Sequence, residues 1–244
     1  MDWNKYREDF LWFSYFGVTK DDVKDNNERA IMACAERAYL DLSRTIKYTY
    51  STSEIEAGKK SVDENERNEM KAYSKWKESY KAYINRKITD EVLGLLNGKS
   101  INDKWYKKIL KFIVEDNGEK VKRRLSAEKQ KALTGISLLE NPLSYGQSQK
   151  WVNMTIKNLL IMGIIPTDDN EMLKEVHIPL DSYIFKRAKE ELKIGAPKTV
   201  WSQLNDEEYY NYQKKISEVK EIPIAWEGDA WINQAKAEKN KTIE

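Results

Sequence analysis

The sequence predicts an all-α fold, and three observations support that prediction. Apolar and aromatic residues recur at intervals of three and four along most of the chain, which is the spacing of one helix face. Charged residues make up 34% of the 244 residues, so the outer helix faces are expected to be highly charged. No long alternating or β-branched run argues for a sheet. A chain of this length can bury a substantial core.

The N-terminal region, residues 1–98, is expected to form helices that pack on the rest of the chain. Its first helix is predicted by an aromatic stripe that stops near Gly17: Trp3, Tyr6, Phe10 and Phe13. A second helix is predicted over residues 26–48. Residues 53–71 are polar and poor in apolar side chains, which indicates a linker or an exposed excursion. Another aromatic stripe predicts the following helix: Tyr73, Trp76, Tyr80 and Tyr83.

Residues 99–244 form a second predicted region, or the two regions make one continuous domain. Turns at Asn97-Gly98 and Asn117-Gly118 bound a helix whose start resembles a capping box, with Ser100 as the cap and Asp103 in the place of glutamate. The remaining expected elements are helices at 148–163, 181–193, 205–219 and 227–239, an extended piece near 177–180 and a frayed tail from Lys236.

Composition excludes several classes of function. Cys34 is the one cysteine, so no internal disulfide forms, and we expect it to be a small buried apolar residue. His177 is the one histidine, which rules out a histidine-based zinc site, and no Gly-x-Ser-x-Gly elbow accompanies it. Without a Walker loop or a Rossmann fingerprint, we expect no cofactor and no metal. No signal peptide or membrane span is recognisable, so the cytoplasm is the expected compartment.

Charge is unevenly distributed, although the net charge is only +2. Residues 99–131 carry 11 Lys/Arg and 5 Asp/Glu, and they include Trp105, Tyr106 and Phe112. A basic block that contains aromatic side chains is compatible with contacts to phosphates. The alternative is a solvated helix face, which is what charge runs usually form.

The segment Ser144-Tyr-Gly-Gln-Ser-Gln-Lys150 carries the first functional signal. Gly146 can adopt a positive φ without steric penalty, so we expect a tight hairpin between two helices. Unpaired N–H groups at a helix start attract a phosphate, and we assign that contact to Gly146, Gln147 and Ser148. Lys150 lies in the first helical turn, where the helix dipole and burial both disfavour a proton on its amine. A deprotonated lysine is a nucleophile for a sugar C1′ carbon or an aldehyde.

The second signal is the segment Ile178-Pro-Leu-Asp-Ser-Tyr183, which brings an aspartate to the start of another helix. Asp181 lies 31 positions after Lys150. If the two segments pack together, the two side chains form a nucleophile–carboxylate pair. In the alternative interpretation Asp181 is only an N-cap and Lys150 is an exposed helix lysine.

Residues 144–151 resemble the helix-hairpin-helix turn of the DNA glycosylase superfamily, whose usual form is Leu-Pro-Gly-Val-Gly-x-Lys-x. Gly146 takes the place of the first family glycine. Lys150 falls on the lysine that bifunctional members, such as 8-oxoguanine glycosylases, use as nucleophile. The sequence departs from the family's proline, aliphatic residue and second glycine at three positions: Tyr145, Gln147 and Ser148.

The segment Pro179-Leu-Asp-Ser-Tyr183 resembles the Pro-Val-Asp-x-His segment that begins the next helix in the same superfamily, with Tyr183 in place of histidine. The resemblance covers residues 144–194. It implies that Asp181 stabilises the positive charge that develops on the sugar as the base departs, and that it helps to activate the nucleophile. The gap between the two segments is longer here than in familiar members, so residues 164–176 are expected to form an insertion loop at the site.

The resemblance implies a monomeric DNA glycosylase, with or without lyase activity, that flips a damaged or modified base out of duplex DNA. Trp151, Tyr183 and Phe185 are candidates for the base pocket, or else core aromatic residues. His177 is a core-edge histidine or a group behind the site. Two other functions remain open: a non-catalytic DNA-binding or phage-defence-associated helical protein, and a helical module that binds protein partners.

Overall fold

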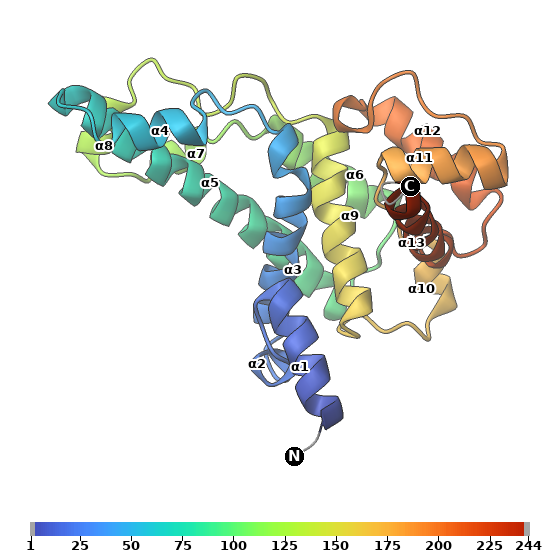
Figure 1. Cartoon of the computed structure of the whole chain (residues 1–244). Coiled ribbons are helices and arrows are strands. Elements are labelled where there is room, and N and C mark those ends of the chain that lie inside the picture. Colours follow the sequence, from blue (N-terminus) through green and yellow to red (C-terminus); the bar gives the residue numbers. More distant parts are fainter. Residues whose placement is uncertain (1–2, 242–244) are drawn as a thin grey trace.

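The predicted all-α fold is confirmed in a computed structural model that describes residues 3–241 (Figure 1). Within those residues the β-structure amounts to an isolated bridge between Tyr48 and Leu139. The α-helices are α1 (Trp3–Phe16), α2 (Lys20–Val23), α3 (Asn27–Leu42), α4 (Thr52–Gly58), α5 (Glu64–Leu96), α6 (Asp103–Glu115), α7 (Glu119–Lys122), α8 (Ala127–Ala132), α9 (Tyr145–Ile161), α10 (Asn170–Lys174), α11 (Ser182–Arg187), α12 (Asp206–Ser217) and α13 (Pro223–Lys241). Three short helical turns accompany them: η1 (Ser43–Thr45), the π-helical η2 (Ala188–Leu192) and η3 (Trp201–Gln203).

Helices α3, α5 and α9 form the centre of the molecule, and α3 packs against both of the others (Figure 1). The inner faces of α3 carry small residues that let its neighbours approach closely, and Ala30, Ala35 and Ala38 are all fully buried. Both regions expected from the sequence contribute to one contiguous apolar core. The candidate site is therefore built on a helix, α9, that the core surrounds.

Aromatic side chains of α5 fasten the connecting segments to the core. The hydroxyl of Tyr73 donates to the carbonyl of Leu138 at 2.6 Å, and Nε1 of Trp76 donates to the carbonyl of Gly118 at 2.9 Å. Both side chains are fully buried. The two carbonyls also accept from backbone amides, so these bonds mainly give the buried hydroxyl and indole N–H a partner. The apolar bodies of the two side chains are therefore buried without leaving a polar end unpaired.

Cys34 is buried in α3, as expected. Its thiol donates to the sulfur of Met162 at 3.2 Å, just beyond the end of α9. Burial raises the pKa of the Cys34 thiol well above its usual range, because the thiolate would have to form away from water.

Of the two alternatives for residues 53–71, the linker is wrong, because that segment holds α4 and the first two turns of α5, whereas most of its residues are exposed, as the other alternative expects. Each helix start is stabilised by a cap. Ser51 and Glu54 form a capping box at α4, and the Asp63 side chain accepts from Asn65 and Glu66 at α5. Apolar spacing alone does not reveal helices of this kind, because their exposed turns carry few apolar residues.

Other element boundaries also differ from expectation. The cap of α6 is Asn102, whose side chain accepts from the amide of Trp105, rather than Ser100. The expected insertion loop contains the short helix α10, which Asp169 caps. Helix α13 begins four residues earlier than expected and continues to Lys241, so the tail is helical beyond Lys236.

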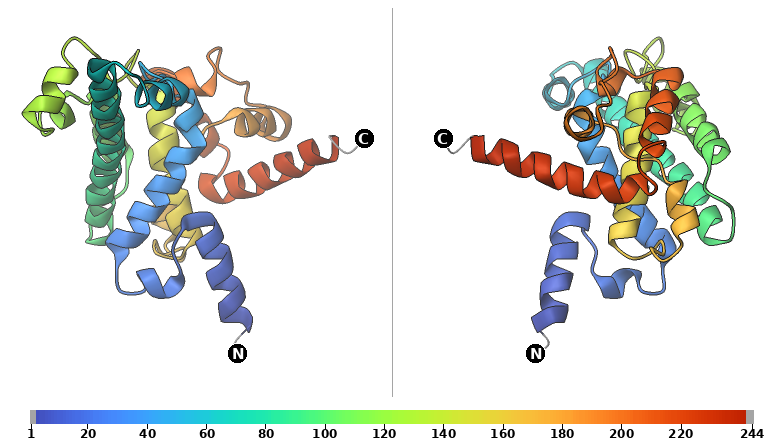
Figure 2. Two further views of the ribbon diagram at one scale, coloured as in Figure 1. Left: turned by 60° about the vertical axis from the view of Figure 1, so that its left-hand side comes forward. Right: turned by 90° about the vertical axis from the view of Figure 1, so that its right-hand side faces the viewer.

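Helices α1 and α13 project from the body (Figure 2). The stripe that predicted α1 lies on its exposed face, where Trp3, Tyr6, Phe10 and Phe13 are 52–61% exposed. Trp12 and Phe16, on another face, pack against the core. Among the described residues, no helix combines the length and the apolar character that crossing a bilayer requires.

Candidate functional site

Helix α9 begins with a capping box. The hydroxyl of Ser144 accepts from the amide of Gln147, and the side chain of Gln147 accepts from the amide of Ser144, both at 3.0 Å. Ser148 is not the cap, since its hydroxyl donates to the carbonyl of Ser144 at 2.8 Å. These reciprocal bonds fix the direction in which α9 leaves the preceding loop.

The expected tight hairpin is absent from this part of the described chain. Residues 133–144 form an irregular connection from α8, and Gly146 lies inside the first turn of α9 rather than at a positive φ. Its lack of a side chain has another cause. A Cβ on Gly146 would lie 1.8 Å from the carbonyl oxygen of Trp201 and 3.0 Å from the amide of Leu204. The glycine lets residues 201–204 lie directly against the helix start.

The phosphate contact assigned to Gly146, Gln147 and Ser148 does not fit this arrangement, because all three residues are buried. The amide of Gly146 donates to the carbonyl of Leu204 at 3.1 Å, and that of Ser148 donates to the carbonyl of Ser144 at 3.0 Å. The start of α9 is thus occupied by the protein's own acceptors, and the prediction of a phosphate site there is wrong.

Lys150 and Asp181 meet across two elements that lie far apart in the sequence. Nζ of Lys150 is 2.7 Å from Oδ2 of Asp181, and their side chains are 7% and 14% exposed. The other carboxylate oxygen, Oδ1, accepts from the amide of Ile184 at 3.0 Å. Asp181 therefore caps α11 and pairs with the lysine at once. The interpretation of Lys150 as an exposed helix lysine is wrong.

Trp201 lies beside this pair. Nζ of Lys150 is 5.9 Å from the centre of the Trp201 ring, a distance at which the ring's negative face attracts a cation. Trp201 belongs to η3, the segment that covers the start of α9. No local sequence pattern links residue 201 to residue 150, so this neighbour is not predictable from the sequence.

A glutamine next to Lys150 holds the segment that carries Asp181. Nε2 of Gln149 donates to the carbonyl of Leu180 at 2.9 Å, and Oε1 of Gln149 accepts from the amide of Leu180 at 3.1 Å. The side chain thus pairs with one residue of the extended segment as a neighbouring strand would. Because Gln149 and Lys150 are consecutive, this bond sets the distance between the lysine and Asp181.

Two further side-chain amides, those of Gln213 and Asn153, hold the same extended segment at Ile178. Gln213 of α12 accepts from the amide of Ile178 at 3.1 Å and donates to its carbonyl at 2.8 Å. Nδ2 of Asn153 lies 2.9 Å from that carbonyl, 3.1 Å from Oε1 of Gln149 and 3.2 Å from the hydroxyl of Tyr209. A chain of buried amides therefore replaces the sheet that an extended segment normally joins.

Replacing Gln149 by methionine is expected to destabilise the protein by about 2–4 kcal/mol, because the amide and carbonyl of Leu180 would stay buried without partners. Chemical denaturation followed by far-UV circular dichroism measures this loss. Gln130 is a matched control, since its side chain also bonds to the backbone, donating to the carbonyls of Arg123 and Leu125, but is only partly buried. Gln130→Met should cost clearly less, and equal losses for the two variants would contradict the role given to Gln149.

His177 lies behind this network. Its ring stacks on Tyr106 with 3.9 Å between ring centres, and Nε2 is 3.0 Å from the carboxylate of Asp103. A carboxylate only accepts, so Nε2 carries the proton and Nδ1 accepts from the hydroxyl of Tyr209 at 2.7 Å. Burial lowers the pKa of His177, while Asp103 opposes that change. The histidine reaches the site only through Tyr209 and the amide chain.

Of the three aromatic candidates for a base pocket, two belong to the core. Trp151 is fully buried, and its Nε1 donates to the carbonyl of Ala35 at 3.1 Å, on the side facing α3. Phe185 is 7% exposed and packs on the ring of Tyr212. These two assignments are wrong. Tyr183 is half-buried beside Trp231, with 5.8 Å between ring centres, and it stays a candidate.

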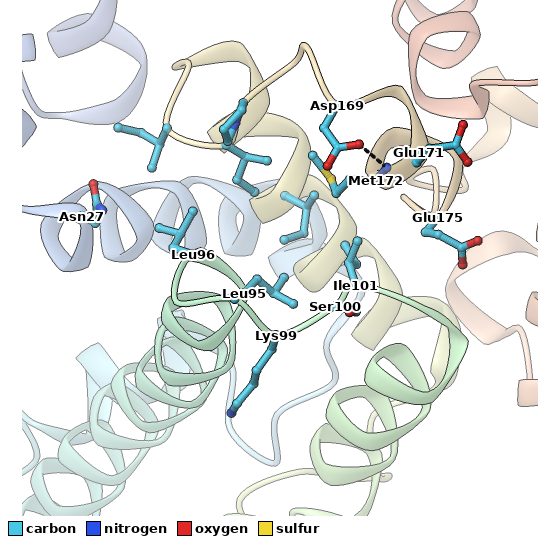
Figure 3. Close-up of a pocket in the computed structure, with 15 residues that line it drawn as sticks. Asn27, Leu95, Leu96, Lys99, Ser100, Ile101, Asp169, Glu171, Met172 and Glu175 are labelled. Atoms are coloured by element: carbon cyan, nitrogen blue, oxygen red, sulfur yellow. Dashed lines mark hydrogen bonds between the residues drawn. The ribbon is translucent and has the colours of Figure 1, made fainter.

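A sizeable cavity lies elsewhere. It has a volume of about 730 Å³ and sits between the ends of α5 and α9 and helix α10 (Figure 3). Its floor is mostly apolar: Leu95, Leu96, Ile101, Ile156, Ile165 and Met172. Lys150 lies near the other end of α9, so cavity size alone does not identify the site. Within residues 3–241 no three histidine, cysteine or acidic side chains are grouped as metal ligands.

The chain was compared with known proteins at three levels. No protein-family model matches it, no curated protein is similar to it in sequence, and no solved structure matches it.

Proposed function

We propose that the protein is a DNA glycosylase that cuts the bond between a damaged or modified base and its deoxyribose, using Lys150 as nucleophile and Asp181 as its carboxylate partner. The observation that carries the proposal is the 2.7 Å contact between Nζ of Lys150 and Oδ2 of Asp181. The two segments that resemble the glycosylase superfamily supply these residues in the expected order. The side chains of Lys150 and Asp181 are 7% and 14% exposed, so the pair lies just beneath the surface.

The chemistry follows from the two groups. Lys150 must lose a proton before it attacks, and Asp181 is an acceptor within reach of that proton. The amine then forms a bond to C1′ as the bond to the base breaks, and the electron pair leaves with the base. The carboxylate stabilises positive charge on the sugar while this happens. Ring opening of the resulting aminal gives a Schiff base, from which strand cleavage can follow.

Backbone contacts to DNA fall to other parts of the chain, since the start of α9 is covered. The exposed cations of α6, α7 and the following loop include Lys104, Lys107, Arg123 and Arg124. A surface that neutralises several phosphates binds DNA with a steep dependence on salt. Tyr183, beside Trp231, is the aromatic candidate for stacking on the flipped base.

A duplex with one abasic site tests the nucleophile without knowledge of the base. Borohydride should reduce the Schiff base and leave the wild-type protein covalently joined to DNA, visible as a shifted band in a denaturing gel. Lys150→Gln should abolish that band, because the amide is not a nucleophile. Duplexes with candidate modified bases then measure base release in the same pair of proteins.

Lys186→Gln provides the matched control, because Lys186 is an exposed lysine on α11, close in sequence to Asp181. It should trap as well as the wild type. A band that persists in Lys150→Gln would remove Lys150 as the nucleophile. Salt-sensitive DNA binding without trapping or base release would instead favour a non-catalytic DNA-binding protein.

A further inference from the structure

A second lysine–carboxylate pair lies on α9, beyond the first. Nζ of Lys157 is 2.7 Å from Oε2 and 2.9 Å from Oε1 of Glu227, which comes from α13. The Glu227 side chain is fully buried, and that of Lys157 is 15% exposed. Burying two charges is costly even when they are paired. The mechanism proposed above makes no use of either group.

The two pairs share one face of the helix. Lys150 and Lys157 are seven residues apart, which places their α-carbons about 10 Å apart along the axis and only about 20° apart around it. Asp181 approaches this face from α11 and Glu227 from α13, and these two helices pack against each other. The ammonium of Lys157 and the carboxylate of Glu227 thus lie on the same face of α9 as the Lys150–Asp181 pair.

Helix α3 contributes the remaining charged groups at this face. Asp41 is half-buried, and its Oδ1 is 3.3 Å from Nη2 of Arg37. Burial raises the pKa of Asp41, and Arg37, Lys150 and Lys157 oppose that rise. Burial likewise raises the pKa of Glu227. Lys157 opposes this rise, and Lys150 opposes it to a smaller extent. Asp41 lies between Ala35, whose carbonyl accepts from Trp151 at 3.1 Å, and Thr45, whose carbonyl accepts from Gln147 at 2.6 Å. This part of α3 therefore runs along the part of α9 that carries Lys150.

We propose that Lys157, Glu227 and Asp41 act on the Lys150–Asp181 pair through their charges and together set how readily Lys150 gives up its proton. The cation of Lys157 favours loss of that proton, whereas the anions of Glu227 and Asp41 oppose it. A neighbouring cation is one of the recognised ways to activate a lysine nucleophile. The functional meaning of this tuning rests on the function proposed above, but the tuning itself does not.

Titration of the free protein tests the inference without any substrate. Protein labelled with ¹³C at the lysine ε-carbons gives an NMR signal for Lys150, identified by its loss in Lys150→Gln. Glu227→Gln removes an anion and leaves Lys157 unbalanced. The titration midpoint of Lys150 should then fall by about one pH unit, as expected for one charge at roughly 10 Å with an effective dielectric constant near 20.

The double variant Lys157→Met/Glu227→Gln is the decisive comparison. It breaks the same ion pair as Glu227→Gln but removes one positive and one negative charge. Its Lys150 midpoint should lie within a few tenths of a pH unit of the wild type. If the pair merely holds α13 in place, both variants lose that support and shift together. That result, or no shift in Glu227→Gln, overturns the proposal.

Asp41→Asn keeps the inference testable should Glu227→Gln fail to fold. Asp41 lies on α3 and takes no part in the Lys157–Glu227 pair. Removal of its charge should lower the Lys150 midpoint by about half a pH unit, since its partial exposure weakens the interaction. An unchanged midpoint would contradict the assigned role of Asp41. If trapping fails but the Lys150 midpoint shifts as expected in the variants, the proposed glycosylase function is removed and the electrostatic coupling stands.

Discussion

Asp181→Asn is expected to lower base release and borohydride trapping at least about a hundredfold, the scale seen when one group that stabilises transition-state charge is removed. Asparagine caps a helix about as well as aspartate, so the bond to the amide of Ile184 should survive. What is lost is the negative charge facing Lys150. The substitution thus separates the two roles that the structure gives to one side chain.

The same substitution should lower the free energy of unfolding by about 3 kcal/mol, because it leaves the largely buried ammonium of Lys150 without its partner. Asp169→Asn is the matched control. Asp169 caps α10 through the amide of Met172, from an exposed position. It should change neither activity nor stability appreciably. Wild-type base release in Asp181→Asn would show that Asp181 is a cap and nothing more.

Gly146→Ala has the largest expected effect on the fold. The added methyl group would lie 1.8 Å from a backbone oxygen, that of Trp201, which no side-chain rotation can relieve. Either α9 or η3 must move, and the bonds from Gly146 to Leu204 and from Ser144 to Ser202 would be strained. We expect a loss of about 3 kcal/mol or more and a melting temperature lower by about 5–10 °C in calorimetry.

Gly228 provides the comparison for that substitution. It lies inside α13, and a Cβ there would meet no atom within 4 Å. Gly228→Ala should stabilise the protein by up to about 1 kcal/mol through helix propensity alone. If the two alanine variants shifted the melting temperature in the same direction and by similar amounts, the close approach at Gly146 would not be the reason for its glycine.

The Lys150–Asp181 pair could be predicted from two short segments: Asp181 directly precedes α11, and Lys150 lies in the second turn of α9, which begins at Tyr145. Capping chemistry is local, so Asp181 was recognisable as a possible cap from the residues beside it, whereas the helix predicted from residue 148 begins at Tyr145 with Ser144 as its cap. A resemblance to a known turn then suggested that the two starts meet. The fold class was predictable for a similar reason, since apolar spacing is visible within a single helix.

The surroundings of the pair depend on distant contacts, and the sequence does not show these. Trp201 and Leu204 cover the start of α9 and occupy the position where a phosphate was expected. Gln149 has a buried role that its polar character hides, because its partners are backbone groups 31 residues away. Trp151 follows Lys150 in the chain but points toward α3, since consecutive helix residues face different directions.

The burial of Cys34 has a practical consequence. The chain's one thiol is shielded from water and resists ionisation, so it stays unreactive toward maleimides or iodoacetamides while the protein is folded. Two cysteines placed at exposed positions, one on α13 and one on the body, would then be the attachment points for a pair of dyes or spin labels. Distances between α13 and the body could be followed in solution without first removing the native sulfur.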